Sequence, residues 1–216
     1  MNVLIKSATI LDSKSDFHNQ TQDILIEKGV ITNISKRLKN PNNYKEIQLD
    51  NLHVSQGWFD SSVCFGEPGF EERETILNGL KAAAKSGFTN VALNANTYPV
   101  LDTNSDISFV KSKAESHAVT LHPIGALTKN SDGKDLAELF DMTNAGAVAF
   151  GDYKKPITNA NLMKIALQYA NSFNGLVCSF PQDNSIAGQG VMNEEVTSTT
   201  IGLKGIPALA EELQVA

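Results

Sequence analysis

The feature that most constrains the fold is a regular alternation of strand-like and helix-like segments after residue 55. Short apolar runs recur roughly every 30 residues, the length of a strand-helix-strand unit, and Ala-rich or amphipathic stretches separate them. Such alternation predicts parallel strands joined by helical crossovers. The expected strands are 58–65, 88–93, 119–124, 147–150 and 176–180, and the expected helices are 71–86, 105–116, 134–143, 159–171 and 207–216.

Residues near the ends of the predicted helices support these assignments. Gly87 and Gly146 follow predicted helices at places where a left-handed residue commonly ends one. Ser105 is a plausible N-cap for the second helix. Pro207 suits the first turn of the last helix, because proline lacks an N–H that would need a partner.

The first 55 residues contain strand-like segments without intervening helix-like ones, and we expect a small β subdomain over 1–55. Strands are predicted at 2–11, 23–27 and 30–34, with Lys28 and Gly29 forming a hairpin turn between the last two. Residues 39–44 are a polar loop and 46–54 is a further strand candidate. So few residues bury too little surface for a robust separate core.

Two architectures fit residues 56–216, an open doubly wound sheet and a barrel that lacks part of its sequence. No G-x-G-x-x-G motif follows the first strand, so nothing favours a dinucleotide-binding fold. A (β/α)8 barrel needs eight units and about 250 residues, whereas the pattern contains only five units. Periodicity alone leaves both architectures open.

Composition excludes several classes of partner. The net charge is −6 and the calculated isoelectric point is about 5.2, which argues against binding nucleic acid or anionic membranes. No apolar run approaches the roughly 20 residues of a membrane-spanning helix. The two cysteines, Cys64 and Cys178, are too few for a disulfide framework. Free thiols in a reducing, cytoplasmic compartment are therefore expected.

Ordered motifs along the chain resemble the dihydroorotase family of amidohydrolases. Residues 57–76 are similar to the family pattern G-x-x-D-x-H-x-H-x-R-E-P-G-x-x-x-K-E-T-I; their sequence is G-W-F-D-S-S-V-C-F-G-E-P-G-F-E-E-R-E-T-I. The stretch N-A-N-T-Y-P-V at 94–100 resembles M-P-N-T-x-P-V, and similar matches continue through H-P-I-G-A-L-T and A-G-A-V-A-F to the last residues. Each motif is weak by itself, but the ordered set covers the whole chain.

The resemblance implies an amidohydrolase-type TIM barrel, (β/α)8, that depends on zinc, with a small β-sandwich built from both chain termini. Residues 56–216 would supply the first five or so βα units, and the chain would be the first half of a longer protein. The family reaction is the reversible cyclisation of N-carbamoyl-aspartate to dihydroorotate in pyrimidine biosynthesis. Some family members without metal ligands act as scaffolds for aspartate carbamoyltransferase.

The chain departs from the family pattern where the family binds metal and substrate. Ser62 and Cys64 stand at the two histidine positions of the first strand, and Gly66 stands at the substrate-binding arginine. Tyr153 replaces an aspartate that can bridge two metals, although the preceding Asp152 is kept. Phe180 replaces a histidine on the fifth strand, and Asn96 is the substrate contact that survives. These changes predict a vestigial pocket without zinc.

Other residues with chemical potential have simpler explanations. Cys64 and Cys178 could ligate a metal but more often such thiols are structural. His122 is expected to be a structural histidine with hydrogen-bonded ring nitrogens, and His18, His53 and His117 to be surface residues. The acidic run 67–74 is interpreted as a solvated first helical turn. Asp152 and Asp183 are expected to cap turns, and Lys154 and Lys155 to be solvated.

Three functions remain in view. The first is a catalytically silent dihydroorotase homologue with a structural or assembly role, whose partner is aspartate carbamoyltransferase or a second copy of itself. The second is an active cyclic-amide hydrolase with a rebuilt metal site that includes Cys64 and Asp152. The third is a small-molecule binder that uses the old pocket, with Asn96 as a polar anchor and with Tyr153 and Phe180 making the pocket smaller and more apolar.

Overall fold

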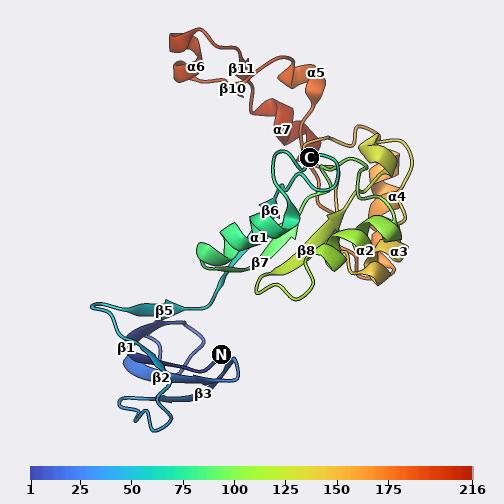
Figure 1. The fold of residues 1–216 in the computed structure, drawn as a ribbon. Coiled ribbons are helices and arrows are strands. Elements are labelled where there is room, and N and C mark those ends of the chain that lie inside the picture. The colour runs from blue at the N-terminus through green and yellow to red at the C-terminus, as the bar shows by residue number, and fades with distance from the viewer. Residues whose placement is uncertain (216) are drawn as a thin grey trace. The chain divides into compact units, whose positions relative to one another are not determined.

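The computed structural model describes residues 1–215 and divides into two compact units, Met1–Gly57 and Trp58–Ala216. The division lies two residues beyond the boundary expected from composition. Ala216, the last residue of the helix predicted at 207–216, lies outside the described residues. Figure 1 shows both units as a ribbon, and each is described separately.

The N-terminal unit is one five-stranded sheet around β1 (Val3–Leu11). β2 (Thr21–Glu27) pairs with β1 antiparallel, and β3 (Val30–Ser35) pairs with β2 antiparallel. The hairpin turn between them is formed as predicted, with positive φ angles of 53° at Lys28 and 82° at Gly29. The buried apolar side chains of this sheet are Val3, Leu4, Ala8, Ile10 and Ile24.

The strand predicted at 46–54 is wrong as a single element. It forms two short strands, β4 (Lys45–Ile47) and β5 (His53–Ser55), which each pair with β1 in parallel. Asn51, with a φ of 54°, lies in the turn between them. Within residues 1–57 the strands make a single sheet, so the second layer of the expected sandwich is not found among the residues described.

The second unit is an α/β structure built on a parallel half-barrel. Its sheet has the order β6-β7-β8-β9, and every neighbouring pair is parallel. The strands are β6 (Trp58–Val63), β7 (Phe88–Leu93), β8 (Thr120–Gly125) and β9 (Ala149–Phe150). The helices that follow them are α1 (Ile76–Lys85), α2 (Asn104–Lys113), α3 (Leu139–Ala145) and α4 (Ala160–Asn171).

The core of this unit lies between the sheet and its helices. Side chains alternate across each strand, so Val91 and Leu93 of β7 enter the main cluster while Ala92 lies on the opposite face. Leu80 of α1 and Phe150 of β9 are almost fully buried in the main cluster. The opposite face carries only a small cluster of Ala92, Ile124 and Ala149.

The fifth strand predicted at 176–180 is not formed as a strand. Only Val177 makes a parallel bridge, to Phe150 of β9. Around it, the Phe150 N–H donates to the Leu176 carbonyl (2.9 Å) and the Cys178 N–H donates to the Phe150 carbonyl (2.8 Å). Pro181 follows at once and has no N–H for a ladder, so the pairing stops after these contacts.

Several helix starts differ from prediction because side-chain caps override periodicity. α1 begins at Ile76 rather than at 71, since the Thr75 side chain accepts the Asn78 N–H (3.3 Å). α2 is capped by Thr103 in a reciprocal capping box with Asp106, so the assignment of Ser105 was wrong.

The ends of α1 and α3 agree with the glycines predicted to close them, whereas α3 begins later than predicted. Gly87 and Gly146 have positive φ angles of 87° and 104° after α1 and α3, as predicted. Asn159 caps α4 through its side chain. The helix predicted at 134–143 begins only at Leu139, after a short 3-10 turn η1 (Lys129–Ser131).

The last part of the chain consists of short elements. In order these are α5 (Asn184–Ala187), β10 (Met192–Asn193), α6 (Val196–Ile201), β11 (Gly205–Ile206) and α7 (Leu209–Val215). β10 and β11 pair in parallel. Pro207 precedes α7, and its carbonyl accepts the Ala210 N–H (3.0 Å). Across residues 1–215, none of the helices combines the length and the apolar character that a bilayer crossing requires.

Candidate functional site

The carboxyl ends of the four parallel strands surround a pocket of about 270 Å³. Ser62 comes from the end of β6, Asn94 from the residue after β7 and Ile124 from β8. The rest of the lining is the two segments that follow β9 and the Val177 bridge, residues 151–154 and 178–180. Chemistry in parallel α/β folds is found at this end of the strands.

Asn94 fastens the ends of β6 and β7 together. Its side chain is buried, and its amide nitrogen lies 3.0 Å from the Ser62 hydroxyl, 3.1 Å from the Val63 carbonyl and 3.7 Å from the Cys64 sulfur. An amide nitrogen has two hydrogens to donate, so these three acceptors share them. Asn94 directly follows β7, and this place after a parallel strand is the sequence signal for a residue of such a site.

Tyr153 and Cys64 interact with each other across the pocket rim. The hydrogen bond with the Cys64 thiol, together with partial burial, raises the pKa of Tyr153 above its ordinary value of 10.0. The Lys154 ammonium lies 5.3 Å from the centre of the Tyr153 ring and opposes that rise in pKa. The phenol is therefore neutral at physiological pH.

Asp152 is buried, and both of its carboxylate oxygens are engaged. One accepts the N–H groups of Leu127 (3.0 Å) and Thr128 (3.1 Å), and the other accepts the Thr128 hydroxyl (2.5 Å). The carboxylate thus fastens the loop after β8 to the end of β9, which confirms the structural role expected for it. Lys154 and Lys155 are exposed, as expected, and Lys155 also donates to the Ser131 carbonyl (3.1 Å).

Phe180 and Cys178 form the wall contributed by the segment after β9. Desolvation raises the pKa of the Cys178 thiol, so the thiol is less ionised than a free one. The backbone of Gly151 approaches this segment closely, because a Cβ on Gly151 would lie 2.6 Å from the Cys178 carbonyl oxygen. Asp183, a little further along, caps α5, as predicted. Its hydrogen bonds with Ser185 hold the pKa of its carboxyl below the ordinary value.

Three of the six predicted site residues, Gly66, Asn96 and Cys64, do not line the pocket. Gly66 is buried in the loop after β6, and a Cβ there would lie 1.9 Å from the Phe70 carbonyl oxygen. Asn96 is half-buried, and its amide oxygen is buried without a hydrogen-bond partner in the described part of the chain. Ser62, Tyr153 and Phe180 do meet in the pocket, with Cys64 in contact through Asn94 and Tyr153.

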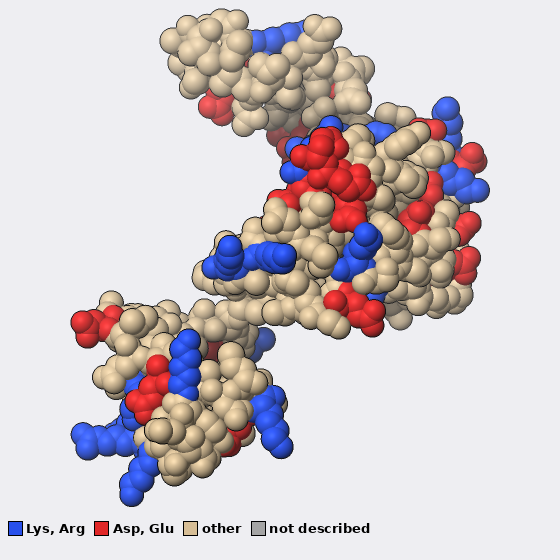
Figure 2. Space-filling view, in the orientation of Figure 1, with Lys and Arg blue, Asp and Glu red and all other residues tan. Residues whose placement is uncertain are grey.

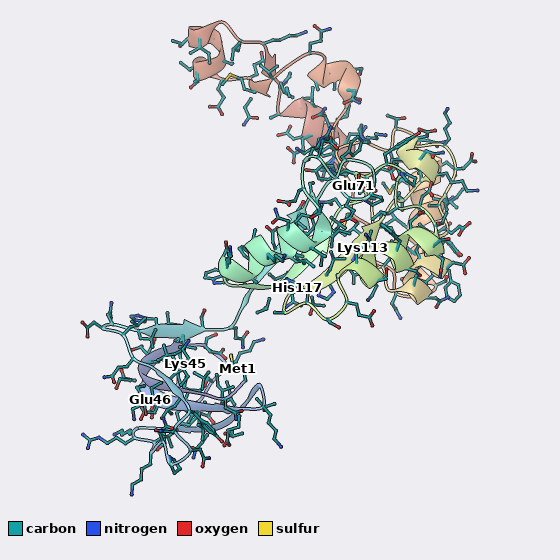
Figure 3. All side chains as sticks on the ribbon, in the orientation of Figure 1. Met1, Lys45, Glu46, Glu71, Lys113 and His117 are labelled. Carbon is teal, nitrogen blue, oxygen red and sulfur yellow. The ribbon has the colours of Figure 1, made fainter. Side chains whose placement is uncertain are left out.

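The loop between β6 and α1 is held by carboxylates rather than forming a helical turn. Glu67 is buried, accepts the Ile76 N–H (2.9 Å) and pairs with Lys113 of α2 (3.0 Å). Glu71 accepts the Gly69 N–H (3.0 Å), which lowers the pKa of the Glu71 carboxyl. Figure 3 labels Glu71 and Lys113 in this region. The interpretation of 67–74 as a solvated first turn was therefore wrong.

The histidines have the structural or surface positions expected of them. A ring nitrogen of His122 lies 2.9 Å from the Asn90 side-chain oxygen, and the ring packs edge-on against Phe59. His18 and His53 are exposed, and His117 is partly exposed. Within residues 1–215, no three side chains of the types His, Cys, Asp and Glu are grouped so that they could hold a metal ion.

Comparisons with known proteins identify the family. The family model "Dihydro-orotase-like" matches residues 53–216. The dihydroorotase of Pelotomaculum thermopropionicum is 44% identical over 216 residues, which are all of this chain and 50% of that protein. The dihydroorotase of Geotalea daltonii is 39% identical over 217 residues, again all of this chain and 51% of the relative. The chain therefore spans about half the length of these curated relatives.

Solved structures agree in fold. An L-hydantoinase from Arthrobacter aurescens superposes with a TM-score of 0.69 at 18% identity, over 86% of this chain and 42% of that one. A dihydroorotase superposes with a TM-score of 0.59 at 13% identity, over 82% of this chain and 50% of that one. At such identities the likeness concerns the fold alone, which is of the amidohydrolase type. Together with the matched family model, these similarities establish that the chain belongs to the dihydroorotase-like family.

Proposed function

We propose that this protein is a dihydroorotase homologue of pyrimidine biosynthesis that has lost the family reaction and serves a structural, assembly role in the cytoplasm. The family reaction interconverts N-carbamoyl-aspartate and dihydroorotate. Relatives that carry the name dihydroorotase support the family function. We further propose that additional units close the half-barrel in the complete protein, since the relatives are about twice as long as this chain.

The observation that carries the proposal is the pair of side chains at two former ligand positions: Tyr153 lines the pocket, and the Cys64 sulfur lies 3.7 Å from the Asn94 amide nitrogen. By the family pattern these positions hold an aspartate and a histidine that would share a metal centre. Here a phenol and a thiol occupy the two positions. A neutral phenol and a single thiol do not replace the ligand set of a family-type metal centre.

The remaining donors do not fit a family-type zinc centre. Zinc sites that catalyse hydrolysis use nitrogen, sulfur and carboxylate ligands with one open position. Ser62 and Phe180 offer a hydroxyl and a phenyl ring. The kept carboxylate, Asp152, already accepts three hydrogen bonds from Leu127 and Thr128, so binding a metal would require the β8 loop to be released.

The decisive experiment is metal analysis of the purified full-length protein, paired with assays of cyclisation and hydrolysis. We expect substoichiometric zinc and no turnover in either direction. One tightly bound zinc per chain that disappears in Cys64→Ala would instead establish the alternative, an active cyclic-amide hydrolase with a rebuilt metal site. Ser61→Ala, at an exposed position of the preceding strand β6, is the matched control.

An assembly role predicts a stable complex with aspartate carbamoyltransferase from the same organism, or self-association. Sedimentation of the full-length protein alone and mixed with that enzyme distinguishes the two. A protein that stays monomeric alone and does not co-sediment with the enzyme would contradict the assembly role.

One observation favours a second candidate, a small-molecule binder. The 270 Å³ pocket remains open between Ile124 and Phe180, and it is large enough for a small ligand. Calorimetric titration with dihydroorotate and with N-carbamoyl-aspartate tests this candidate. Saturable heat that Phe180→Ala abolishes, without any turnover, would favour binding over a purely structural role.

A further inference from the structure

The N-terminal unit has a hollow of its own, with a volume of about 450 Å³. It is lined by Lys6 and Ser7 of β1, Asp23 of β2 and the loop 36–39 that follows β3. The loop contributes Lys36, Arg37 and Lys39, all of them exposed. Four cations therefore border the hollow together with a single carboxylate.

That carboxylate is committed to holding the loop. Asp23 accepts the Lys6 ammonium (2.5 Å), the Ser7 N–H (2.9 Å) and the Leu38 N–H (2.9 Å). The Lys6 ammonium also donates to the Leu38 carbonyl (3.0 Å). Both backbone groups of Leu38 are thus fixed to the sheet, and the side chains on either side of it project from an anchored backbone.

The Asp23 carboxyl, which holds Lys6 and Leu38 together, is ionised at neutral pH. Burial of Asp23 by itself raises the pKa of the carboxyl, but the hydrogen bonds from Lys6, Leu38 and Ser7 outweigh that effect and hold the pKa below its ordinary value of 3.8. Because the pKa of Asp23 is lower in the folded state, the ionised Asp23 carboxylate stabilises the fold at pH values above its ordinary pKa. This contribution is lost as the pH falls through the lowered value.

The cations of the loop have no acidic partner. Among the described residues the ion pairs are Lys6–Asp23, Arg73–Glu72 and Lys113–Glu67, so Lys36, Arg37 and Lys39 are unpaired within residues 1–215. The chain as a whole has a net charge of −6, which makes a concentrated positive hollow exceptional. Figure 2 shows basic side chains projecting from this unit, whereas acidic ones gather on the other unit around the loop that contains Glu71.

We propose that this hollow binds the phosphate group of a small phosphate ester. Arg37 matches two oxygens of a tetrahedral anion through its planar fork, and the lysines act as point charges on either side. A phosphate ester carries a charge of about −1.5 to −2 and three acceptor oxygens. It can therefore pair with several cations at once, whereas a ligand with a carboxylate group carries a single charge. A hollow of this size has room for an organic portion as well.

The test is titration of the full-length protein with inorganic phosphate and with pyrophosphate, followed by calorimetry and by amide chemical shifts of residues 36–39. We expect saturable binding at one site. Replacing a cation that bonds an anion typically weakens binding roughly tenfold, and we expect that loss in Arg37→Ala and a comparable loss in Lys39→Ala. Lys14→Ala and Lys28→Ala, exposed lysines of the same unit outside the hollow, should bind as the unaltered protein does.

The outcomes separate specific binding from general charge attraction. Absence of saturation with both probes overturns the proposal, and so does an equal loss in the two control variants. Vesicles that contain phosphatidic acid distinguish the source of the phosphate. If the protein binds these vesicles through Arg37, the ester is a lipid headgroup, and if it binds only the soluble probes, the ester is a free metabolite. Circular dichroism of each variant shows that the unit remains folded.

Discussion

The helix side of the half-barrel sheet and the strand-end pocket differ in how tightly they are specified. On the helix side, Leu80, Leu93 and Phe150 are almost completely buried in one apolar cluster. At the strand ends, Ser62 is exposed and Tyr153 and Phe180 are half-exposed. The Ser62 hydroxyl accepts a hydrogen bond from the Asn94 amide (3.0 Å). The scaffold thus depends on close packing, whereas the pocket tolerates changes of chemical type.

The loop after β6 shows the same division on a smaller scale. The residues that match the family pattern include Glu67, which accepts the Ile76 N–H at the start of α1, and Thr75, which caps α1. The residues that depart from it, Ser62 and Cys64, contact Asn94 at the edge of the pocket. A chain can therefore keep family motifs for structural reasons, and those motifs by themselves do not establish the family reaction.

Among substitutions that compare the core with the pocket, Phe150→Ala is expected to cause the largest loss of stability. Phe150 is about 1% exposed in the core, and truncating such a side chain costs about 3–5 kcal/mol of unfolding free energy. Phe180→Ala, at the pocket wall, should cost less than about 1 kcal/mol. Urea denaturation measures both. Equal losses for the two variants would show that the pocket is as tightly packed as the core.

A somewhat smaller loss is expected for Gly66→Arg, which restores the family arginine. The new Cβ would lie 1.9 Å from the Phe70 carbonyl oxygen, and overpacking of this kind costs about 1–3 kcal/mol. Ser61→Arg, at an exposed position nearby, is the control and should be close to neutral. A Gly66→Arg protein of unchanged thermal stability would show that the loop still accommodates a side chain there.

Asp152→Asn tests whether the kept carboxylate is structural. The substitution replaces one oxygen by an N–H donor opposite the donors of Leu127 and Thr128, and a buried group left without its partner costs about 1–3 kcal/mol. Asp132→Asn, exposed in the same loop, is the matched control. Hydrogen exchange should then show the 127–133 loop opening more often only in Asp152→Asn.

The smallest effect concerns the titration of Tyr153. Because the Cys64 thiol raises the pKa of Tyr153, Cys64→Ala should move the pKa down towards 10.0, the ordinary value for tyrosine. Ultraviolet absorbance of the phenolate measures this, and Tyr153→Phe identifies which component of the titration belongs to Tyr153. An unchanged titration in Cys64→Ala would show that the thiol does not perturb the Tyr153 phenol.

Local signals in the sequence are enough to predict the parallel α/β class, the existence and order of β6 to β9 and the helices α1 to α4. Strand periodicity and glycine at helix ends are local signals, and Gly87 and Gly146 adopt the left-handed conformation predicted for them. The ordered motifs also identified the family. Ser62, Tyr153 and Phe180 could be placed at one pocket because strand ends of a parallel sheet meet at one edge.

Three features depend on contacts in the folded chain: which residue caps α2, the reduction of the predicted strand at 176–180 to a bridge, and the roles of Glu67 and Asp152. Thr103 prevails over Ser105 because Asp106 completes its capping box. Glu67 and Asp152 are buried, and each is paired there with a residue distant in the sequence, Lys113 and Thr128 respectively. Local periodicity does not contain such long-range hydrogen bonds, and so it does not show which carboxylates are free to take part in chemistry.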